Sequence, residues 1–310
     1  MSEEDNEEVD DTSSSCCAFC GIAEIDDIKL KDCDGCDLVK YCSDVCREDH
    51  KSAHEEDCKK RAAELSDELL FKQPESTHLG DCPICSVPLP LDNLKINMYH
   101  CCSKVICRGC AHANEIREAE TRQQHHICPF CREIIAKTDE EFDKQIMKRV
   151  EANNPDAMCQ QGGLQYKKGD YSGAFENLKK AAALGYAKAH YELSILYQKG
   201  KAVEEFKGKG IYHLEEAAIC GHPDSRFQLG FTEWQNLNVE KAVKHWIIAA
   251  TQGHDGSIKV LMKTFKGGFI SKEDLSSALR AHKAAVDATK SPQRDKAEDY
   301  QRFRQEFLSK

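Results

Sequence analysis

The chain has 310 residues, 40% of them hydrophobic, and a formal net charge of −10. This composition fits a globular protein of two or three domains and excludes a fibrous or low-complexity chain. No run of 18 or more apolar residues occurs, so we expect no membrane-spanning helix.

The charge is distributed unevenly along the chain. Residues 1–150 carry 19 Lys/Arg and 33 Asp/Glu, whereas residues 151–310 carry 24 and 20. Zinc modules that bind nucleic acid use clustered Lys/Arg to neutralise phosphates. The acidic first half therefore predicts protein partners and argues against nucleic acid.

The N-terminal segment, residues 1–15, is acidic and has no apolar stretch. We expect a disordered tail there, not a secretory signal, and hence a cytoplasmic or nuclear protein that is not secreted. Sixteen of the eighteen cysteines lie between Cys16 and Cys131. In a reducing compartment such a cluster favours metal binding over disulfides.

The first cysteine cluster, residues 16–58, has the spacing of two closed zinc sites. Two-residue gaps place two thiolates against one ion, and residues four apart on a helix share one face. Eight donors complete two tetrahedral sites with no open position, as in structural zinc sites. The candidate ligands are Cys17, Cys20, Cys33, Cys36, Cys42, Cys46, His54 and Cys58.

This order and spacing, with Tyr41 before Cys42, resemble a MYND-type zinc finger. The resemblance implies interleaved ligands. One set is Cys17, Cys20, Cys42 and Cys46, and the other is Cys33, Cys36, His54 and Cys58. Family members often carry Trp where this chain has Lys51, in a region that helps bind short proline-containing peptides. Cys16 is surplus, and His50 is the alternative to His54.

The next segment, residues 59–79, reads as a helical connector. Residues 59–72 lack Gly and Pro, and Pro74 stops the helix. We expect its apolar residues Leu65, Leu69 and Phe71 to pack on one of the fingers.

The second cluster, residues 80–133, resembles a RING-type zinc finger. It has three two-residue knuckles and a Cys101-Cys102 doublet. The resemblance implies one site of Cys82, Cys85, Cys107 and Cys110, and a second that includes Cys102, Cys128 and Cys131. RING fingers commonly place another ligand at the position of Lys104, whose ammonium is a poor zinc donor. Cys101 is the first candidate to replace it, ahead of His100, His125 and His126, so up to four Zn²⁺ ions are expected in the chain. A three-ligand site that keeps a water is the remaining alternative.

Three residues beside these ligands bear on activity. In RING-type ubiquitin ligases, the positions of Ile84 and Pro129 form an apolar shelf for the ubiquitin-conjugating enzyme, and a cation at the position of Arg132 contacts that enzyme and ubiquitin. Such a ligase orients its partners and supplies no nucleophile, so no catalytic residue is expected. The alternative is that Ile84 and Pro129 only pack the finger and Arg132 is a solvated charge.

Residues 134–290 predict paired helices with internal repetition. Three Ala-rich segments end in Gly185, Gly221 and Gly253, each suited to a left-handed helix cap, with further helices starting near Ala189, Ser225 and Ser257. Small residues are expected where paired helices approach closely: Ala174, Ala181, Ala217, Ala242 and Ala249.

This pattern resembles Sel-one-like repeats, relatives of tetratricopeptide repeats, and implies a curved solenoid that binds a protein or peptide. We expect Cys159 and Cys220 to be buried as small apolar residues. Residues 291–310 should form a charged C-terminal helix that is partly frayed.

The expected fold class is therefore mostly α, with two small zinc-stabilised fingers before an α-solenoid. The function predicted by resemblance is a RING-type ubiquitin ligase whose repeats dock a substrate. The alternative is a zinc-dependent scaffold without enzymatic activity.

Overall fold

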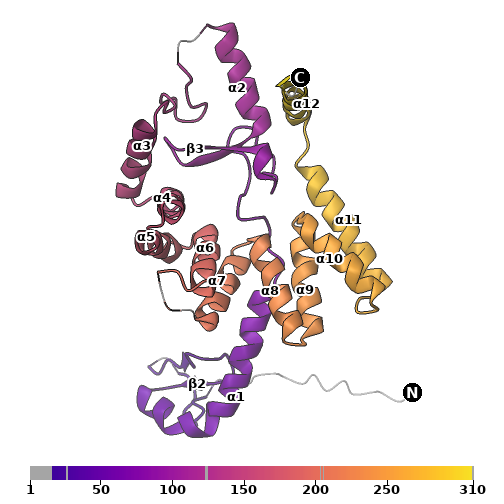
Figure 1. Ribbon diagram of the computed structural model, residues 1–310. Coiled ribbons are helices and arrows are strands. Elements are labelled where there is room, and N and C mark those ends of the chain that lie inside the picture. The colour runs from indigo at the N-terminus through magenta and orange to yellow at the C-terminus, as the bar shows by residue number, and fades with distance from the viewer. Residues whose placement is uncertain (1–15, 26, 123–124, 203, 205, 309–310) are drawn as a thin grey trace, which may run out of the picture. The chain divides into compact units, whose positions relative to one another are not determined.

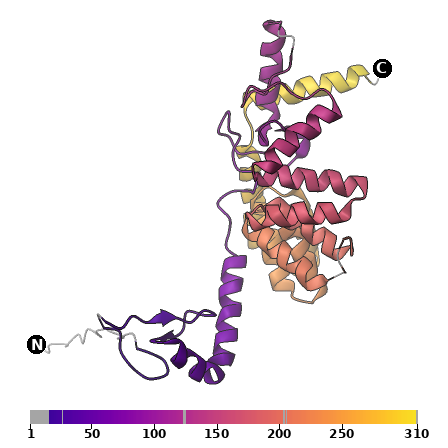
Figure 2. The same ribbon diagram turned by 90° about the vertical axis from the view of Figure 1, so that its left-hand side faces the viewer.

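The computed structural model describes residues 16–25, 27–122, 125–202, 204 and 206–308. The acidic tail expected over residues 1–15 lies outside the described residues. The protein is mostly helical and divides into two compact units, residues 1–70 and 71–310 (Figures 1 and 2). Within the described residues, no helix combines the length and apolar character needed to cross a membrane.

The first unit contains the first cysteine cluster and one long helix. Strands β1 (Lys31–Asp32) and β2 (Lys40–Tyr41) pair antiparallel, with Lys31 opposite Tyr41. Helix α1 (Asp44–Leu70) starts with Asp44 in its first turn, where a carboxylate favours the positive end of the helix dipole. The helix expected over residues 59–72 is the C-terminal part of α1, which ends at Leu70.

The second unit begins with the second cysteine cluster. A short 3-10 helix η1 (Asn93–Lys95) leads into strand β3 (Ile96–Tyr99), which pairs antiparallel with β4 (Lys104–Cys107). Helix α2 (Arg108–Glu120) follows directly, and the Cys107 side chain caps its first turn. A small core of Leu89, Ile106 and Ala111 supports these elements beside the cysteines.

Most of the rest of the second unit, residues 139–288, is a stack of helix pairs that forms the repeat array, and α12 follows it (Figure 1). In sequence, α4 packs on α5, α6 on α7 and α8 on α9, and each pair also packs on the next. The helices are α3 (Asp139–Glu151), α4 (Pro155–Lys168), α5 (Tyr171–Ala183), α6 (Ala187–Gln198), α7 (Lys207–Ile219), α8 (Pro223–Gln235), α9 (Val239–Thr251), α10 (Asp255–Lys266), α11 (Lys272–Ala288) and α12 (Pro292–Leu308).

Glycine ends the helices of the array where the sequence predicts it. Gly185, Gly221 and Gly253 have φ of 75°, 79° and 89°, in the left-handed region that glycine adopts without a steric penalty. The next helices begin at Ala187, Pro223 and Asp255.

The small residues expected at close helix crossings are confirmed as buried. Each is 0% exposed: Ala174, Ala181, Ala217, Ala242 and Ala249. Two apolar clusters form the core of the array, one around Leu178, Leu193 and Leu196, the other around Trp246 and Leu261. Trp246 is 1% exposed and its indole N–H donates to the Phe227 carbonyl at 3.2 Å. The array therefore has a conventional core of apolar side chains.

Three expectations about individual residues are wrong. Leu69 is 53% exposed, and Phe71 packs against His245 of α9, with ring centroids 4.7 Å apart, so it rests on the repeat array and not on a finger. Cys159 is buried as expected, but Cys220 is exposed. Cys220 is the C-cap of α7, where a side chain leaves the packed helix face.

The charged helix expected over residues 291–310 corresponds to α12 within the described residues. Its first half is packed against the second finger, with Arg294 5% and Ala297 1% exposed, whereas Phe303 and Phe307 near its end are 66% and 74% exposed. Fraying is therefore expected only beyond the packed part.

Candidate metal centres

Among the described residues, four groups of Cys and His side chains gather their donor atoms within 4.8 Å of one another. We call them tetrads 1 to 4. They are Cys17, Cys20, Cys42 and Cys46 (tetrad 1); Cys33, Cys36, His54 and Cys58 (tetrad 2); Cys82, Cys85, Cys107 and Cys110 (tetrad 3); Cys101, Cys102, Cys128 and Cys131 (tetrad 4).

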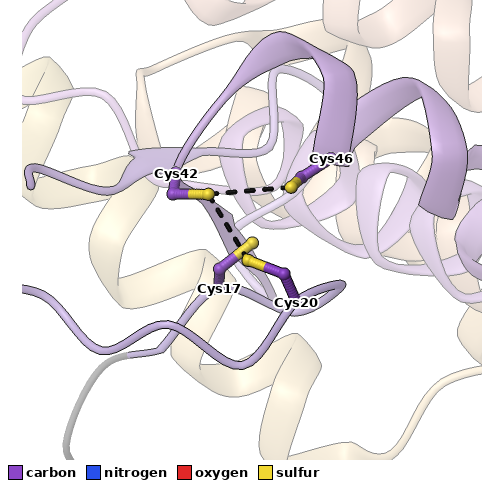
Figure 3. Close-up of side chains that lie close together, drawn as sticks. All are labelled: Cys17, Cys20, Cys42 and Cys46. Atoms are coloured by element: carbon purple, nitrogen blue, oxygen red, sulfur yellow. Dashed lines mark hydrogen bonds between the residues drawn. The ribbon is translucent and has the colours of Figure 1, made fainter.

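Tetrad 1 brings together two loop cysteines, Cys42 directly after β2 and Cys46 in the first turn of α1 (Figure 3). The backbone at Cys17 bridges to Lys40, which places the Cys17–Cys20 turn beside β2. The Cys42 sulfur lies 3.5 Å from that of Cys20 and 3.6 Å from that of Cys46. Zinc–sulfur bonds of about 2.3 Å in a tetrahedron put sulfurs about 3.8 Å apart, while a disulfide needs about 2.0 Å. The spacing fits a metal and not disulfides.

Tetrad 2 joins the turn between β1 and β2 to α1. Cys33 and Cys36 lie in that turn, while His54 and Cys58 are one helical turn apart on α1. The Cys36 sulfur is 3.2 Å from His54 Nε2, and the Cys33 and Cys58 sulfurs are 3.7 Å apart. His54 is the histidine that joins the tetrad.

The neighbouring His50 has another role. Its Nδ1 lies 3.1 Å from the Tyr41 hydroxyl, and its ring stacks on that of His54 at 5.8 Å. Cys16 is exposed and lies outside the four groups.

Tetrad 3 is built on the start of α2. Its Cys85 and Cys107 sulfurs are 3.8 Å apart. The backbone N–H of Cys107 donates to the Cys82 sulfur, and that of Cys110 donates to the Cys107 sulfur, each at 3.4 Å. Backbone N–H groups at a helix start favour thiolates, so the local fold prepares this tetrad for an ion.

Tetrad 4 contains the fourth donor for which the sequence left several candidates. The Cys101 and Cys131 sulfurs are 3.4 Å apart, and the Cys102 and Cys128 sulfurs are 3.8 Å apart. The Lys104 ammonium lies 5.8 Å from the centre of the Phe130 ring, so it makes a cation–π contact and belongs to no tetrad.

The histidines considered as alternatives to Cys101 are not in the tetrad. His100 hydrogen-bonds Gln160, His126 Nδ1 lies 2.9 Å from the Glu118 carboxylate, and His125 is exposed. Cys101 is thus the donor that completes the group.

One structural residue of the second finger was missed by the sequence analysis. Glu118 is 4% exposed and accepts hydrogen bonds from the Ile127 N–H and from Asn114 Nδ2, both at 2.9 Å. The bond from Ile127 ties α2 to the segment that precedes Cys128, where Ile127 bridges to Ile134. The sequence offers no signal for this role, because Glu118 is one of several charged residues in its helix.

The thiols of tetrad 3 oppose one another's ionisation. A hydrogen bond from Cys107 lowers the pKa of Cys82 to about 4. The same interaction, together with burial, strongly raises the pKa of Cys107, and burial raises that of Cys110 to about 12. Neighbouring negative charges in a dry site oppose one another, and a divalent ion removes that opposition. The donor sets are therefore compatible with several zinc ions.

Comparison with known proteins supports the first finger directly. Residues 17–58 match the MYND finger family model. This range contains tetrads 1 and 2.

Comparison with solved structures found partial likenesses. A Sel1 repeat protein from Oxalobacter formigenes aligns with a TM-score of 0.43 and 26% identity over 50% of this chain and 66% of that chain. A protective antigen with an SLR fold from uropathogenic Escherichia coli aligns with a TM-score of 0.39 and 20% identity over 53% of this chain and 37% of that chain.

A curated protein is similar to part of this chain in sequence. It is the mouse (Mus musculus) protein named DAP3-binding cell death enhancer 1, which is 24% identical over 175 residues, 44% of this chain and 34% of the relative. The chain thus spans about a third of the length of the curated relative that it matches. The MYND finger match and the stack of helix pairs in the structure are two separate features of this chain.

Proposed function

We propose that the protein is a zinc-dependent interaction protein in which the second finger recruits a ubiquitin-conjugating enzyme and the repeat array docks a substrate or partner. All sixteen tetrad residues serve as zinc ligands in this proposal. The ions hold the two fingers in shape and leave no open coordination position for chemistry.

The interleaved order of tetrads 3 and 4 is the observation that carries the ligase proposal. The first and third cysteine pairs meet in one tetrad, and the second and fourth pairs meet in the other. This is the pairing that the RING resemblance implies. Ions bound in these tetrads would fix the conformation of the loop that carries Ile84 and of the loop that carries Pro129 and Arg132.

The surface beside these ligands suits a protein partner. Ile84 is 44% and Phe130 43% exposed, Pro129 is half-buried and Arg132 is exposed. Exposed apolar side chains next to a cation resemble the centre of many protein interfaces. We propose that this shelf binds the conjugating enzyme and that Arg132 contacts the enzyme and ubiquitin together.

A self-modification assay tests the ligase proposal. The purified chain is mixed with activating enzyme, a panel of conjugating enzymes, ubiquitin and ATP, and chain formation is followed. We expect Ile84→Ala and Arg132→Ala to abolish ubiquitin chains while zinc content stays unchanged.

Two control variants in the same finger match these changes. Leu94→Ala removes an apolar side chain that is 78% exposed, and Arg122→Ala removes an exposed arginine which, like Arg132, has a positive φ. Both controls should keep activity. Loss of activity in the controls, or a fully zinc-loaded protein that responds to no enzyme of the panel, contradicts the ligase proposal.

The alternative proposal is a scaffold without ligase activity, and the position of Lys104 favours it. The Lys104 ammonium sits over the exposed Phe130 ring, so a cation occupies part of the apolar shelf. Under this proposal Lys104→Ala leaves the protein inactive in the same assay. Under the ligase proposal Lys104→Ala keeps or increases activity.

The first finger is proposed to bind a short peptide. A cavity of about 800 Å³ lies against α1 and is lined by Tyr41, Lys51 and Ala62 among others. Lys51 is the residue at which this chain departs from the Trp often present in MYND fingers. Fluorescence anisotropy with a labelled proline-containing peptide tests the proposal, with Lys51→Trp expected to tighten binding. No binding by the parent or the variant contradicts it.

A further inference from the structure

The C-terminal helix α12 is packed on the second finger, although about 160 residues separate the two in sequence. The Tyr300 ring stacks on that of His112 of α2 at 4.6 Å, and the Glu298 carboxylate lies 2.8 Å from the Lys95 ammonium. The Ala297 side chain is 1% exposed. The finger is therefore completed by a segment from the far end of the chain.

Arg294, in the first turn of α12, reaches the metal-binding part of the finger. Its guanidinium is buried and donates to the carbonyls of Pro88 and Thr289, each at 2.6 Å, and of Val87 at 2.9 Å. Its Nη2 also lies 3.6 Å from the Cys85 sulfur of tetrad 3. One side chain thus fixes the loop after Cys85 and contacts a sulfur of the site.

The charge of Arg294 complements tetrad 3. Four thiolates around a divalent ion leave a net charge of −2, and a buried cation in hydrogen-bonding range offsets part of it. Groups that hydrogen-bond to metal ligands hold them in position and slow metal loss.

The backbones of α2 and α12 approach closely at the same place. A Cβ added at Gly109 would lie 2.9 Å from the Arg294 backbone nitrogen and 3.0 Å from its Cα. Even a methyl group at position 109 would push the start of α12 away from tetrad 3. The close approach of the backbones and the buried guanidinium are separate observations, and both indicate that the start of α12 supports tetrad 3.

We propose that Arg294 is a positioning residue for the metal site of tetrad 3, and that α12 acts as a latch which retains the ion in that site alone. The proposal rests on zinc binding by tetrad 3 and is independent of ligase activity. Because α12 follows the repeat array, a partner that pulls α12 away would loosen one metal site of the finger.

Site-resolved cysteine labelling tests the latch on the full-length, zinc-loaded protein. A chelator and an alkylating reagent are added together, and mass spectrometry follows the labelling of each cysteine with time. In Arg294→Met, which removes the charge but keeps much of the side-chain volume, we expect Cys85 and Cys107 to label about tenfold faster or more. The cysteines of tetrads 1, 2 and 4 should keep the parent rate within about twofold, well below the effect expected at tetrad 3.

The matched control is Arg304→Met, which changes an exposed arginine of the same helix. It should leave all rates unchanged. Parent-like labelling of tetrad 3 in Arg294→Met, or an equal acceleration at all four tetrads, overturns the proposal.

Two further variants keep the test decisive if Arg294→Met does not fold. Arg294→Lys keeps the charge but loses the forked hydrogen bonds, so tetrad 3 should label at an intermediate rate. Gly109→Ala leaves Arg294 intact and displaces α12, so tetrad 3 should again label faster. Parent-like rates in both variants overturn the latch. An inactive ubiquitination assay has no bearing on that result, because labelling is read without any enzyme partner.

Discussion

The first finger, residues 16–58, and the second finger, residues 80–133, each gather eight metal-type donors, but they differ in what surrounds the donors. Several large apolar side chains of the first finger are about half exposed, including Phe19, Ile25 and Leu38. The second finger buries Leu89, Ile106 and Ala111 beside its cysteines and is covered by α12. We therefore expect the first finger to depend on metal almost alone, whereas the second should share its stability with an apolar core and a docked helix.

Removing the metal should reveal the largest difference in stability between the two fingers. Structural zinc contributes about 10–16 kcal/mol in finger peptides, against about 3–5 kcal/mol from the core of so small a module. With chelator and reductant, hydrogen exchange should show complete loss of protection in residues 17–43. Part of the protection in α2 and all of that in α8 and α9 should remain. Equal loss of protection in both fingers would contradict the comparison.

A core substitution in the repeat array should give the opposite pattern. Trp246→Ala removes a side chain that is 1% exposed, so we expect a loss of about 3–5 kcal/mol in the free energy of unfolding. Urea unfolding followed by circular dichroism measures the loss, and zinc content should stay the same. The control Met262→Ala, at a side chain that is 47% exposed, should cost far less. Loss of zinc in Trp246→Ala would show that the stability of the fingers depends on the packing of the array.

Two helix-cap glycines offer a smaller and sharper test. Gly185 and Gly221 both have positive φ, so alanine at either position costs about 1–2 kcal/mol of backbone strain. A Cβ at Gly185 meets nothing within 4 Å, but at Gly221 it would lie 2.7 Å from the Ser76 carbonyl. Gly221→Ala should therefore lose at least about 1 kcal/mol more than Gly185→Ala in thermal unfolding. Equal losses would mean that the backbone of residues 76–78 moves away from the added Cβ without a measurable cost in stability.

The smallest expected effect concerns pH. Burial lowers the pKa of His78 from 6.5 to about 4, and the His78 ring packs on His222 at 4.2 Å between centroids. The unfolded chain takes up the proton first, so stability that is present above pH 6.5 is lost as pH falls through about 4. His78→Phe should reduce the loss of stability between pH 7 and pH 5, measured by urea unfolding. An unchanged loss would exclude His78 as a source of this pH dependence.

Much of the metal chemistry could be predicted from the sequence because ligand spacing is a local property. Two-residue knuckles and the four-residue step from His54 to Cys58 each fix two donors within a turn or one helix face, and the structure gathers all the donors named. Cys101 was predictable because it adjoins Cys102. The helix ends in the array were predictable for the same reason, because a glycine that follows an Ala-rich helix indicates a left-handed cap from neighbouring residues alone.

The rest could not be predicted because it depends on contacts between distant segments. Arg294 lies 209 residues after Cys85, and nothing in a charged helix marks one arginine as buried. Phe71 packs on His245 and not on a finger for the same reason: an apolar residue in a connector does not specify which surface will cover it. The exposure of Cys220 reflects its place at a helix end, which the alanine-rich pattern around it did not reveal.

The central claim is that the four donor groups hold four zinc ions, and native mass spectrometry of the reduced protein tests it most directly. We expect four ions per chain, three after Cys101→Ser, and four after the control Cys16→Ser, because Cys16 lies outside the four donor groups. A metal-free native chain, or a parent and a Cys101→Ser variant with equal zinc content, would contradict the account.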